Sequence, residues 1–154
     1  MNHGLVVIDD TDSHRTLLET AAQHAAGADA DLVLLPMASN ESVAAEREAI
    51  SQVSDAHAST FGTDTTEQRL VHTTKRIARE ALTDVDADVE YTIVPRIVDG
   101  KKEATAILDA ADQHDCDHIF MIGTKRSRTG KAIFGSLAQS VMLAFDGQVT
   151  VELE

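Results

Sequence analysis

Hydrophobic residues along this chain gather in short runs that alternate with longer amphipathic segments. Five runs predict β-strands, over residues 4–9, 31–37, 89–94, 118–123 and 148–153. Four of them are almost continuously apolar, which is typical of strands that are covered on both faces. Pro36 predicts the end of the second strand, because proline has no N–H to donate to a neighbouring strand.

Apolar residues spaced three and four positions apart predict helices between these strands. The helical segments are 11–27, 64–82, 99–115 and a last one from about residue 135 to residue 145. Asp12 or Ser13 can cap the first helix, and Gly27 can end it. Residues 39–62 predict a variable excursion that contains a helix.

The alternation of strands with helices predicts an α/β fold, in which a doubly wound parallel sheet carries helices on both faces. No internal repeat or long linker divides the chain, so residues 1–154 are expected to form a single domain. Ligands of such folds bind beyond the carboxyl ends of the strands, where the strand order reverses. If the first and fourth strands are neighbours, Asp9, Met37 and Gly123 meet there in one crevice.

Charge changes this picture, because the chain has 13 Lys and Arg against 26 Asp and Glu, a net charge of −13. Aspartate outnumbers glutamate and lysine is scarce, which predicts the hydrated surface of a halophilic protein. Such a surface repels nucleic acid and anionic lipid. No apolar run is long enough to span a bilayer, and no secretory signal is expected from the first residues of the sequence. With one cysteine and hence no internal disulfide, the chain is expected in the cytoplasm.

One segment is an exception to the acidic character. Four cations lie within residues 125–131: Lys125, Arg126, Arg128 and Lys131. The segment follows a buried strand and precedes a helix that Ser136 could cap, so helix N–H groups and cations can face one anion. This pattern predicts a nucleotide phosphate site, and the alternative is a solvated basic loop. It is no Walker loop, because Ala132 stands where that motif needs Ser or Thr.

Taken together, these segments resemble the universal stress protein family over nearly the whole chain. "IDDTDS" (8–13) is similar to its first strand end, with Asp10 in the place of a glycine, and "LLPM" (34–37) stands where its second strand ends. "GKKEATAI" (100–107) is similar to a helix start of the family, and Gly123 with Gly135-Ser136 matches the ends of its ATP-binding motif. The resemblance implies a Rossmann-like, five-stranded parallel sheet in the order 3-2-1-4-5.

The resemblance also implies a set of binding residues. Asp9 would lie near adenosine, Met37 would contact adenine or ribose, Ile122 and Gly123 would line base and ribose, and Gly135, Ser136 and Leu137 would cradle phosphate. Arg126 stands where the family has a second glycine, so Lys125, Arg126 and Lys131 would replace backbone donors. Two of these residues have structural alternatives, since Asp9 can simply end a strand and Met37 can belong to the core.

The resulting expectation is a cytoplasmic stress-response factor that binds ATP or a related adenine nucleotide, with or without Mg²⁺. No catalytic base is evident, so no dedicated catalysis is expected. The resemblance implies a homodimer through strand 148–153. One alternative is a nucleotide-free dimeric adaptor, and another is a phosphotransferase in which Asp9, Asp10 and Asp12 hold Mg²⁺. "HDCDH" (114–118) is not expected to bind metal, because His114 ends a helix and His118 begins a strand.

Overall fold

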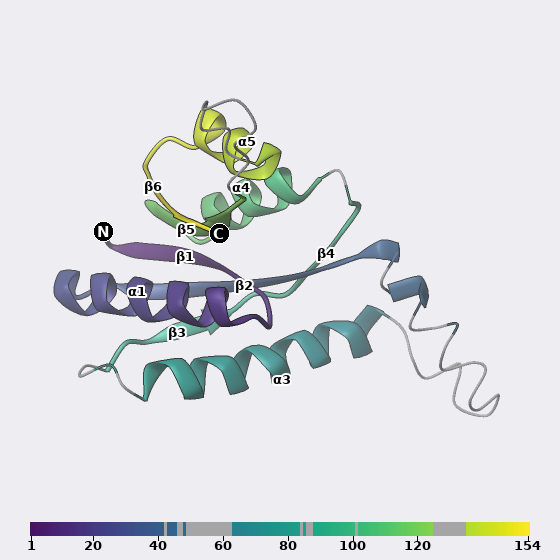
Figure 1. The fold of residues 1–154 in the computed structure, drawn as a ribbon, viewed down its shortest axis with the longest axis horizontal. Coiled ribbons are helices and arrows are strands. Elements are labelled where there is room, and N and C mark those ends of the chain that lie inside the picture. Colours follow the sequence, from purple (N-terminus) through teal and green to yellow (C-terminus); the bar gives the residue numbers. More distant parts are fainter. Residues whose placement is uncertain are drawn as a thin grey trace.

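The computed structural model describes residues 1–41, 43–45, 48, 63–83, 85, 88–100, 102–124 and 135–154 (Figure 1). The strands are β1 (His3–Ile8), β2 (Asp31–Ser39), β3 (Tyr91–Ile93), β4 (Arg96–Val98), β5 (His118–Gly123) and β6 (Gln148–Leu153). The helices are α1 (Asp12–Ala28), α3 (Thr63–Leu82), α4 (Glu103–Gln113) and α5 (Ser136–Ala144). Residues 40, 41, 43–45 and 48 are also helical, and the rest of 42–62 lies outside the described residues.

All strand pairs are parallel, and the sheet has the order β3-β2-β1-β5-β6, with β4 beside the far end of β2. The predicted fold class is therefore confirmed. The predicted third strand, 89–94, is wrong in its bounds, because β3 covers only Tyr91–Ile93 and a second short strand, β4, follows at Arg96–Val98. Their register on β2 does not change across the interruption, since Leu34 pairs with Ile93 and Met37 with Arg96.

Two prolines explain the interruption. The unchanged register places Pro95 beside Pro36, so neither residue has an N–H group to offer at this level of the sheet. Val94 still donates its N–H to the Leu34 carbonyl at 2.9 Å, and pairing resumes only after Pro95. The prediction that Pro36 ends the second strand is wrong, because β2 continues through it to Ser39.

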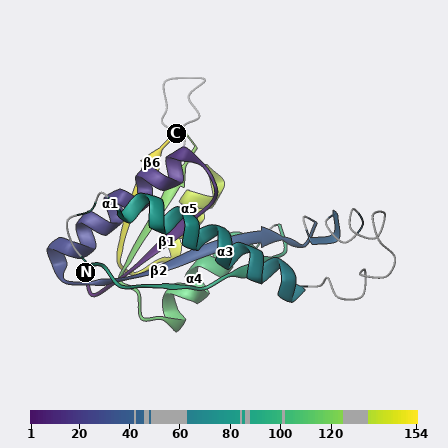
Figure 2. The same ribbon diagram turned by 90° about the horizontal axis from the view of Figure 1, so that it is seen from below.

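Alternate residues of the strands pack against two layers of helices. Val6 and Ile8 of β1 point to the face that α1 and α3 cover, whereas Leu5 and Val7 belong to the core under α4 and α5. Figure 2 shows α1 and α3 side by side on the first of these faces. The predicted inward residues of α1 are all buried: Leu17, Leu18, Ala21, Ala22 and Ala25.

The ends of the helices differ from the sequence prediction. Thr11, rather than Asp12 or Ser13, caps α1, and its hydroxyl accepts the His14 N–H at 3.1 Å. The helix runs through Gly27 and stops at Asp29, which adopts the left-handed conformation (φ 54°) that a short polar side chain tolerates. Helix α4 is shorter than the predicted 99–115.

Candidate functional site

The sheet opens between β1 and β5 at the carboxyl ends of the strands. Paired residues of β1 and β5 run from Gly4–His118 only to Val6–Phe120, although the strands continue to Ile8 and Gly123. On their outer sides both strands stay paired to the end. Helix α1 leaves toward one face and α5 lies on the other, so this opening is the switch point of the fold.

Asp9 and Met37 lie in one pocket on the α3 side of this opening. The pocket measures about 80 Å³, and its walls come from the ends of β1 and β2 and from α3, including Arg69 and Thr73. Asp9 is exposed, and its Oδ1 accepts the backbone N–H of Asp10 at 2.8 Å. Met37 is half-buried and packs against the core under α4 and α5, so it serves the core and the pocket together.

Ile122 and Gly123 have packing roles that the sequence did not reveal. The Ile122 side chain packs on the core under α1 and α3. Gly123 is buried, and a Cβ atom at this position would lie 2.5 Å from Cγ1 of Val151 on β6. The close approach of β6 by itself therefore accounts for a glycine at position 123.

The start of α5 lies on the opposite side of the sheet opening from α3. Gly135 is the N-cap residue, and among the described residues no side chain caps this helix. Ser136 was predicted as the cap, but it is the first helical residue and it is exposed. Ser136 and Leu137 line a groove of about 470 Å³ together with Glu103 of α4. The uncapped N–H groups of α5 suit an anion.

The structure brings the predicted residues together in two groups rather than one. Asp9 and Met37 share the pocket under α3, whereas Ser136 and Leu137 share the groove beside α4. Thr124 lies against Gly135, because a Cβ on Gly135 would be 3.5 Å from the Thr124 Cβ. The predicted cationic residues between them, Lys125, Arg126 and Lys131, lie outside the described residues.

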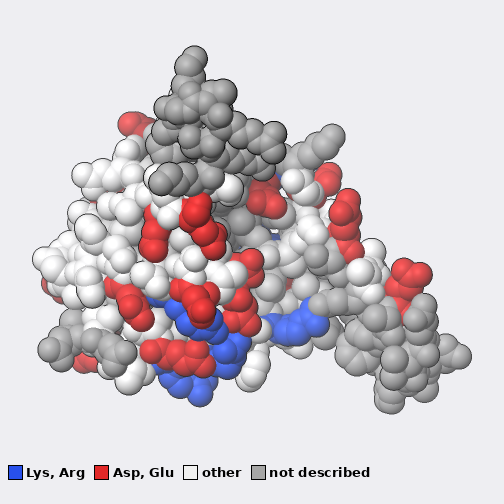
Figure 3. All heavy atoms as spheres, in the orientation of Figure 1, with Lys and Arg blue, Asp and Glu red and all other residues white. Residues whose placement is uncertain are grey.

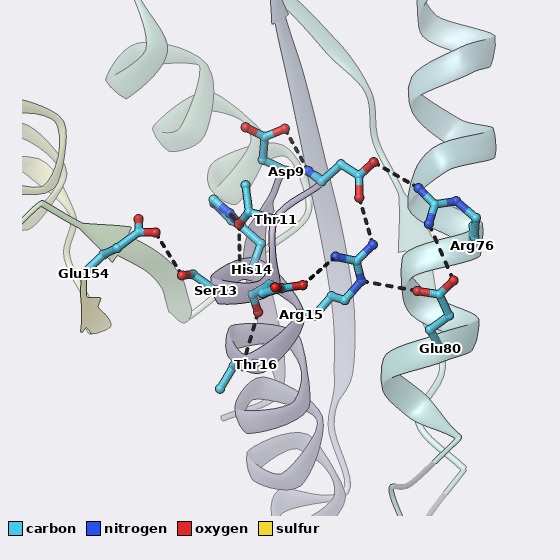
Figure 4. Close-up of polar contacts among 11 residues, drawn as sticks. Asp9, Thr11, Ser13, His14, Arg15, Thr16, Arg76, Glu80 and Glu154 are labelled. Carbon is cyan, nitrogen blue, oxygen red and sulfur yellow. Dashed lines mark hydrogen bonds and ion pairs between the residues drawn. The ribbon is translucent and has the colours of Figure 1, made fainter.

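A second group of polar contacts surrounds Asp9 (Figure 4). The Ser13 hydroxyl donates to Glu154 Oε1 at 2.9 Å, and His14 Nδ1 lies 2.7 Å from the Thr11 hydroxyl. Burial lowers the pKa of His14, and the negative charges of Asp9, Glu154 and Glu152 partly oppose this effect. The first turn of α1 is thus bordered by carboxylates, so it is a poor place for phosphate.

The structure also reveals a cluster of cations that sequence reasoning passed over. Arg69, Lys75, Arg76 and Arg79 of α3 make up four of the thirteen Lys and Arg residues, and all four are exposed. In Figure 3, Lys and Arg side chains gather with acidic ones at the lower edge, where α3 lies. Arg76 and Arg15 of α1 both bind Asp10 and Glu80. The spacing of Arg76 and Glu80 was the available signal, since residues four apart meet on a helix.

Within the described residues, no group of three or more His, Cys, Asp or Glu side chains is placed to hold a metal ion. None of the helices that the structure describes is long and apolar enough to cross a membrane.

Several solved structures share this fold. The hypothetical protein MJ0577 is 14% identical with a TM-score of 0.68, covering 99% of this chain and 96% of that one. A universal stress protein in complex with cAMP is 18% identical (TM-score 0.55, covering 99% and 96%). The Archaeoglobus fulgidus universal stress protein in complex with dAMP is also 18% identical (TM-score 0.58, covering 98% and 97%). No curated protein matches this sequence.

At such identities these likenesses establish the fold alone. The family assignment has a separate basis, since residues 1–151 match the description of the universal stress protein family. This match takes in the helices, both groups of candidate site residues and all the strands except the last two residues of β6, and with it the chain belongs to the universal stress protein family.

Proposed function

We propose that this domain binds ATP or a related adenine nucleotide in the opening between β1 and β5. The observation that carries the proposal is the loss of pairing between these strands after Val6 and Phe120, at the switch point of the sheet. Support comes from the structural neighbours that hold cAMP and dAMP. The pocket beside Asp9 and the uncapped start of α5 flank the opening on its two sides.

The residues suit the two ends of a nucleotide differently. Asp9 offers a carboxylate oxygen to the hydroxyl or amino donors of a nucleoside, in the pocket that Met37 also lines. The N–H groups of Ser136 and Leu137 suit phosphate, aided in the sequence by Lys125, Arg126 and Lys131. If Mg²⁺ accompanies the nucleotide, Glu103 in the neighbouring groove would supply a carboxylate oxygen as a ligand.

The proposed role is that of a cytoplasmic sensor or stress-response factor, which needs binding but no dedicated catalysis. The strongly acidic composition supports operation in concentrated salt. A homodimer through β6 is part of the proposal, because β6 is the last strand of the sheet order and its Leu153 is 48% exposed. An exposed strand edge favours pairing with a second chain.

Isothermal titration with ATP in concentrated KCl tests the proposal. Micromolar affinity is expected for the wild-type protein, and it should be lost in Arg126→Glu/Lys131→Glu. The matched control is Lys75→Glu/Arg79→Glu, which makes the same change in net charge on the exposed face of α3. Equal loss in both variants would assign the effect to overall charge, and unchanged affinity in the first would remove residues 126 and 131 from the site.

The second candidate function is a nucleotide-free dimeric adaptor. The observation that favours it is Leu143 of α5, which is 81% exposed and so offers apolar surface to another protein. A folded dimer that gives no heat with ATP, and no nucleotide in mass spectrometry of the purified protein, would support this candidate instead.

A further inference from the structure

Four charged side chains form a closed ring beside the candidate site. Asp10 Oδ1 lies 2.9 Å from Arg15 Nη2, and Asp10 Oδ2 lies 3.0 Å from Arg76 Nη2. Glu80 closes the ring, with Oε2 at 3.2 Å from Arg15 Nε and Oε1 at 3.5 Å from Arg76 Nη1. Each carboxylate thus uses one oxygen for each arginine, as Figure 4 shows. We call these residues the Asp10 ring.

The Asp10 ring joins three parts of the fold that are distant in sequence. Asp10 belongs to the turn after β1, Arg15 to the first part of α1, and Arg76 and Glu80 to α3. Arg15 also contacts Asp12 at 3.3 Å, within the first turn of α1. The ring therefore fixes the turn after β1 against both helices on this face of the sheet.

The same turn controls the orientation of Asp9. The Asp10 N–H donates to Asp9 Oδ1 at 2.8 Å, and the Thr11 N–H donates to the Asp9 carbonyl at 3.0 Å. In Figure 4, one carboxylate oxygen of Asp9 carries the dashed contact, and the second oxygen lies on the other side of the carboxylate group. Helix α3 also supplies Arg69 and Thr73 to the pocket that Asp9 lines. A displaced Asp10 would therefore move Asp9 and loosen the opposite wall of the pocket together.

We propose that Asp10, Arg15, Arg76 and Glu80 are positioning residues that hold the Asp9 carboxylate and helix α3 in the geometry of the ligand site. This inference rests on the proposed nucleotide function. Asp10 also lines the pocket, whereas Arg15, Arg76 and Glu80 lie outside it and act through Asp9, Asp10 and the wall of the pocket rather than by touching the ligand.

The exposure of the ring determines how it responds to salt. Its side chains are 25% to 51% exposed, so each single pair contributes little by itself. The closed arrangement is more stable than four separate pairs, because each side chain keeps one ion-pair partner when its contact with the other partner opens. Its contacts of 2.9–3.5 Å are comparable with a Debye length of about 3 Å at 1 M salt, so direct contacts persist where longer-range interactions are screened.

Asp10→Asn and Arg76→Gln test the inference by two measurements. The affinity for ATP should fall roughly fivefold in each variant, the factor that corresponds to about 1 kcal/mol. Proton NMR of the protein without nucleotide should show a lower pKa for His14, because the Asp9 charge that raises it moves away. Glu152, Glu154 and the Thr11 hydroxyl also face His14 and stay unchanged.

The matched control is Arg79→Gln, which removes the same charge from the exposed face of α3 and has no ion pair with a described residue. It should change neither the affinity nor the His14 pKa. The double variant Asp10→Asn/Arg76→Gln should weaken binding no more than the sum of the single effects, because both break the same ring.

Two outcomes would overturn the inference. One is a fall in thermal stability with the His14 pKa and the ATP affinity unchanged, which would make the ring a structural clamp only. The other is an equal effect of Arg79→Gln, which would assign the change to the charge of α3. If the wild-type protein binds no nucleotide, the proposed function fails, whereas the His14 measurement still decides whether the ring positions Asp9.

Discussion

Replacing Gly123 with alanine is expected to destabilise the domain through a clash with β6. The new Cβ would lie 2.5 Å from Val151 Cγ1, and 3.4 Å from Leu153 Cδ2. The first distance is shorter than non-bonded carbon atoms accept. The Val151 side chain cannot turn away easily, because its branched Cβ restricts χ1. The strands β5 and β6, which pair along their whole length, must therefore shift.

The size of the effect follows from two opposing contributions. Overpacking a well-filled core costs about 1–3 kcal/mol. Alanine restricts the unfolded chain more than glycine does, which returns about 0.4–1 kcal/mol. A contact as short as 2.5 Å belongs in the upper half of the overpacking range, about 2–3 kcal/mol, so subtracting the full return of about 1 kcal/mol leaves a net loss in the free energy of unfolding of about 1–2 kcal/mol. For a chain of this size, each kcal/mol lowers Tm by about 2–4 °C, so a fall of roughly 2–8 °C is expected.

Urea unfolding followed by circular dichroism measures this loss, and a second substitution identifies its cause. Val151→Ala removes the Cγ1 atom that would clash. The loss of stability in Gly123→Ala/Val151→Ala should therefore be smaller than the sum of the losses in the two single variants. A Gly123→Ala protein as stable as wild type would refute the packing argument. Purely additive losses would show that Val151 is not the neighbour that requires glycine.

The double variant also separates packing from ligand contact at the same position. The sequence resemblance implied that Gly123 lines the base and ribose of a nucleotide. If the glycine serves β6 alone, the double variant should bind ATP as tightly as wild type. If the ligand also needs the space that glycine leaves free, the double variant should bind ATP more weakly than wild type even though its stability is restored.

Three further predictions concern single titratable groups. Burial raises the pKa of Cys116 to about 11, with help from the adjacent carboxylates, so iodoacetamide should modify it only after unfolding, as mass spectrometry would show. Burial and His24 lower the pKa of His118, so the unfolded chain binds this proton more readily than the folded one. The free energy of unfolding should therefore fall as the pH drops below about 6.5. In urea titrations, His118→Gln should reduce this pH dependence. Desolvation raises the pKa of Asp117, but hydrogen bonds from the N–H groups of Asn2 and His3 outweigh it, so the pKa is lowered. Asp117→Ala should therefore lower Tm at neutral pH. The difference in Tm from wild type should shrink in acid, where Asp117 becomes protonated.

The strands were predictable where burial leaves a continuous apolar run. Strands β5 and β6 begin and end at the predicted residues, and β1 is shifted by one. The inward face of α1 was also predictable, because a helix must turn its apolar side to the sheet. These features depend on local periodicity, which the sequence displays directly.

The helix ends were misplaced by only a few residues, whereas the larger errors involve residues that are distant in sequence. By itself, Pro36 predicts a strand end. In the structure Pro95 lies beside it, so both prolines fall at the single gap between β3 and β4, and β2 can continue. The Asp10 ring spans residues 10 to 80, and the sequence presented Asp10 as a departure from the glycine of the resembling motif or as a candidate Mg²⁺ ligand, not as a partner of two arginines. Contacts of this kind follow from topology, which periodicity alone does not provide.

Charge argues for one orientation of a nucleotide in the opening. Asp9 has Glu152 and Glu154 near it across His14, and a phosphate about 4 Å from such a carboxylate would be repelled by about 4 kcal/mol at an effective dielectric constant of 20. At the start of α5 the uncapped N–H groups attract anions instead, although Glu103 lines the groove beside them. A multiply charged phosphate chain there needs positive charge to offset Glu103, which the cations of residues 125–131 or a bound Mg²⁺ would supply. The nucleoside end of a bound nucleotide would then lie toward Asp9, whose carboxylate we propose the Asp10 ring to hold.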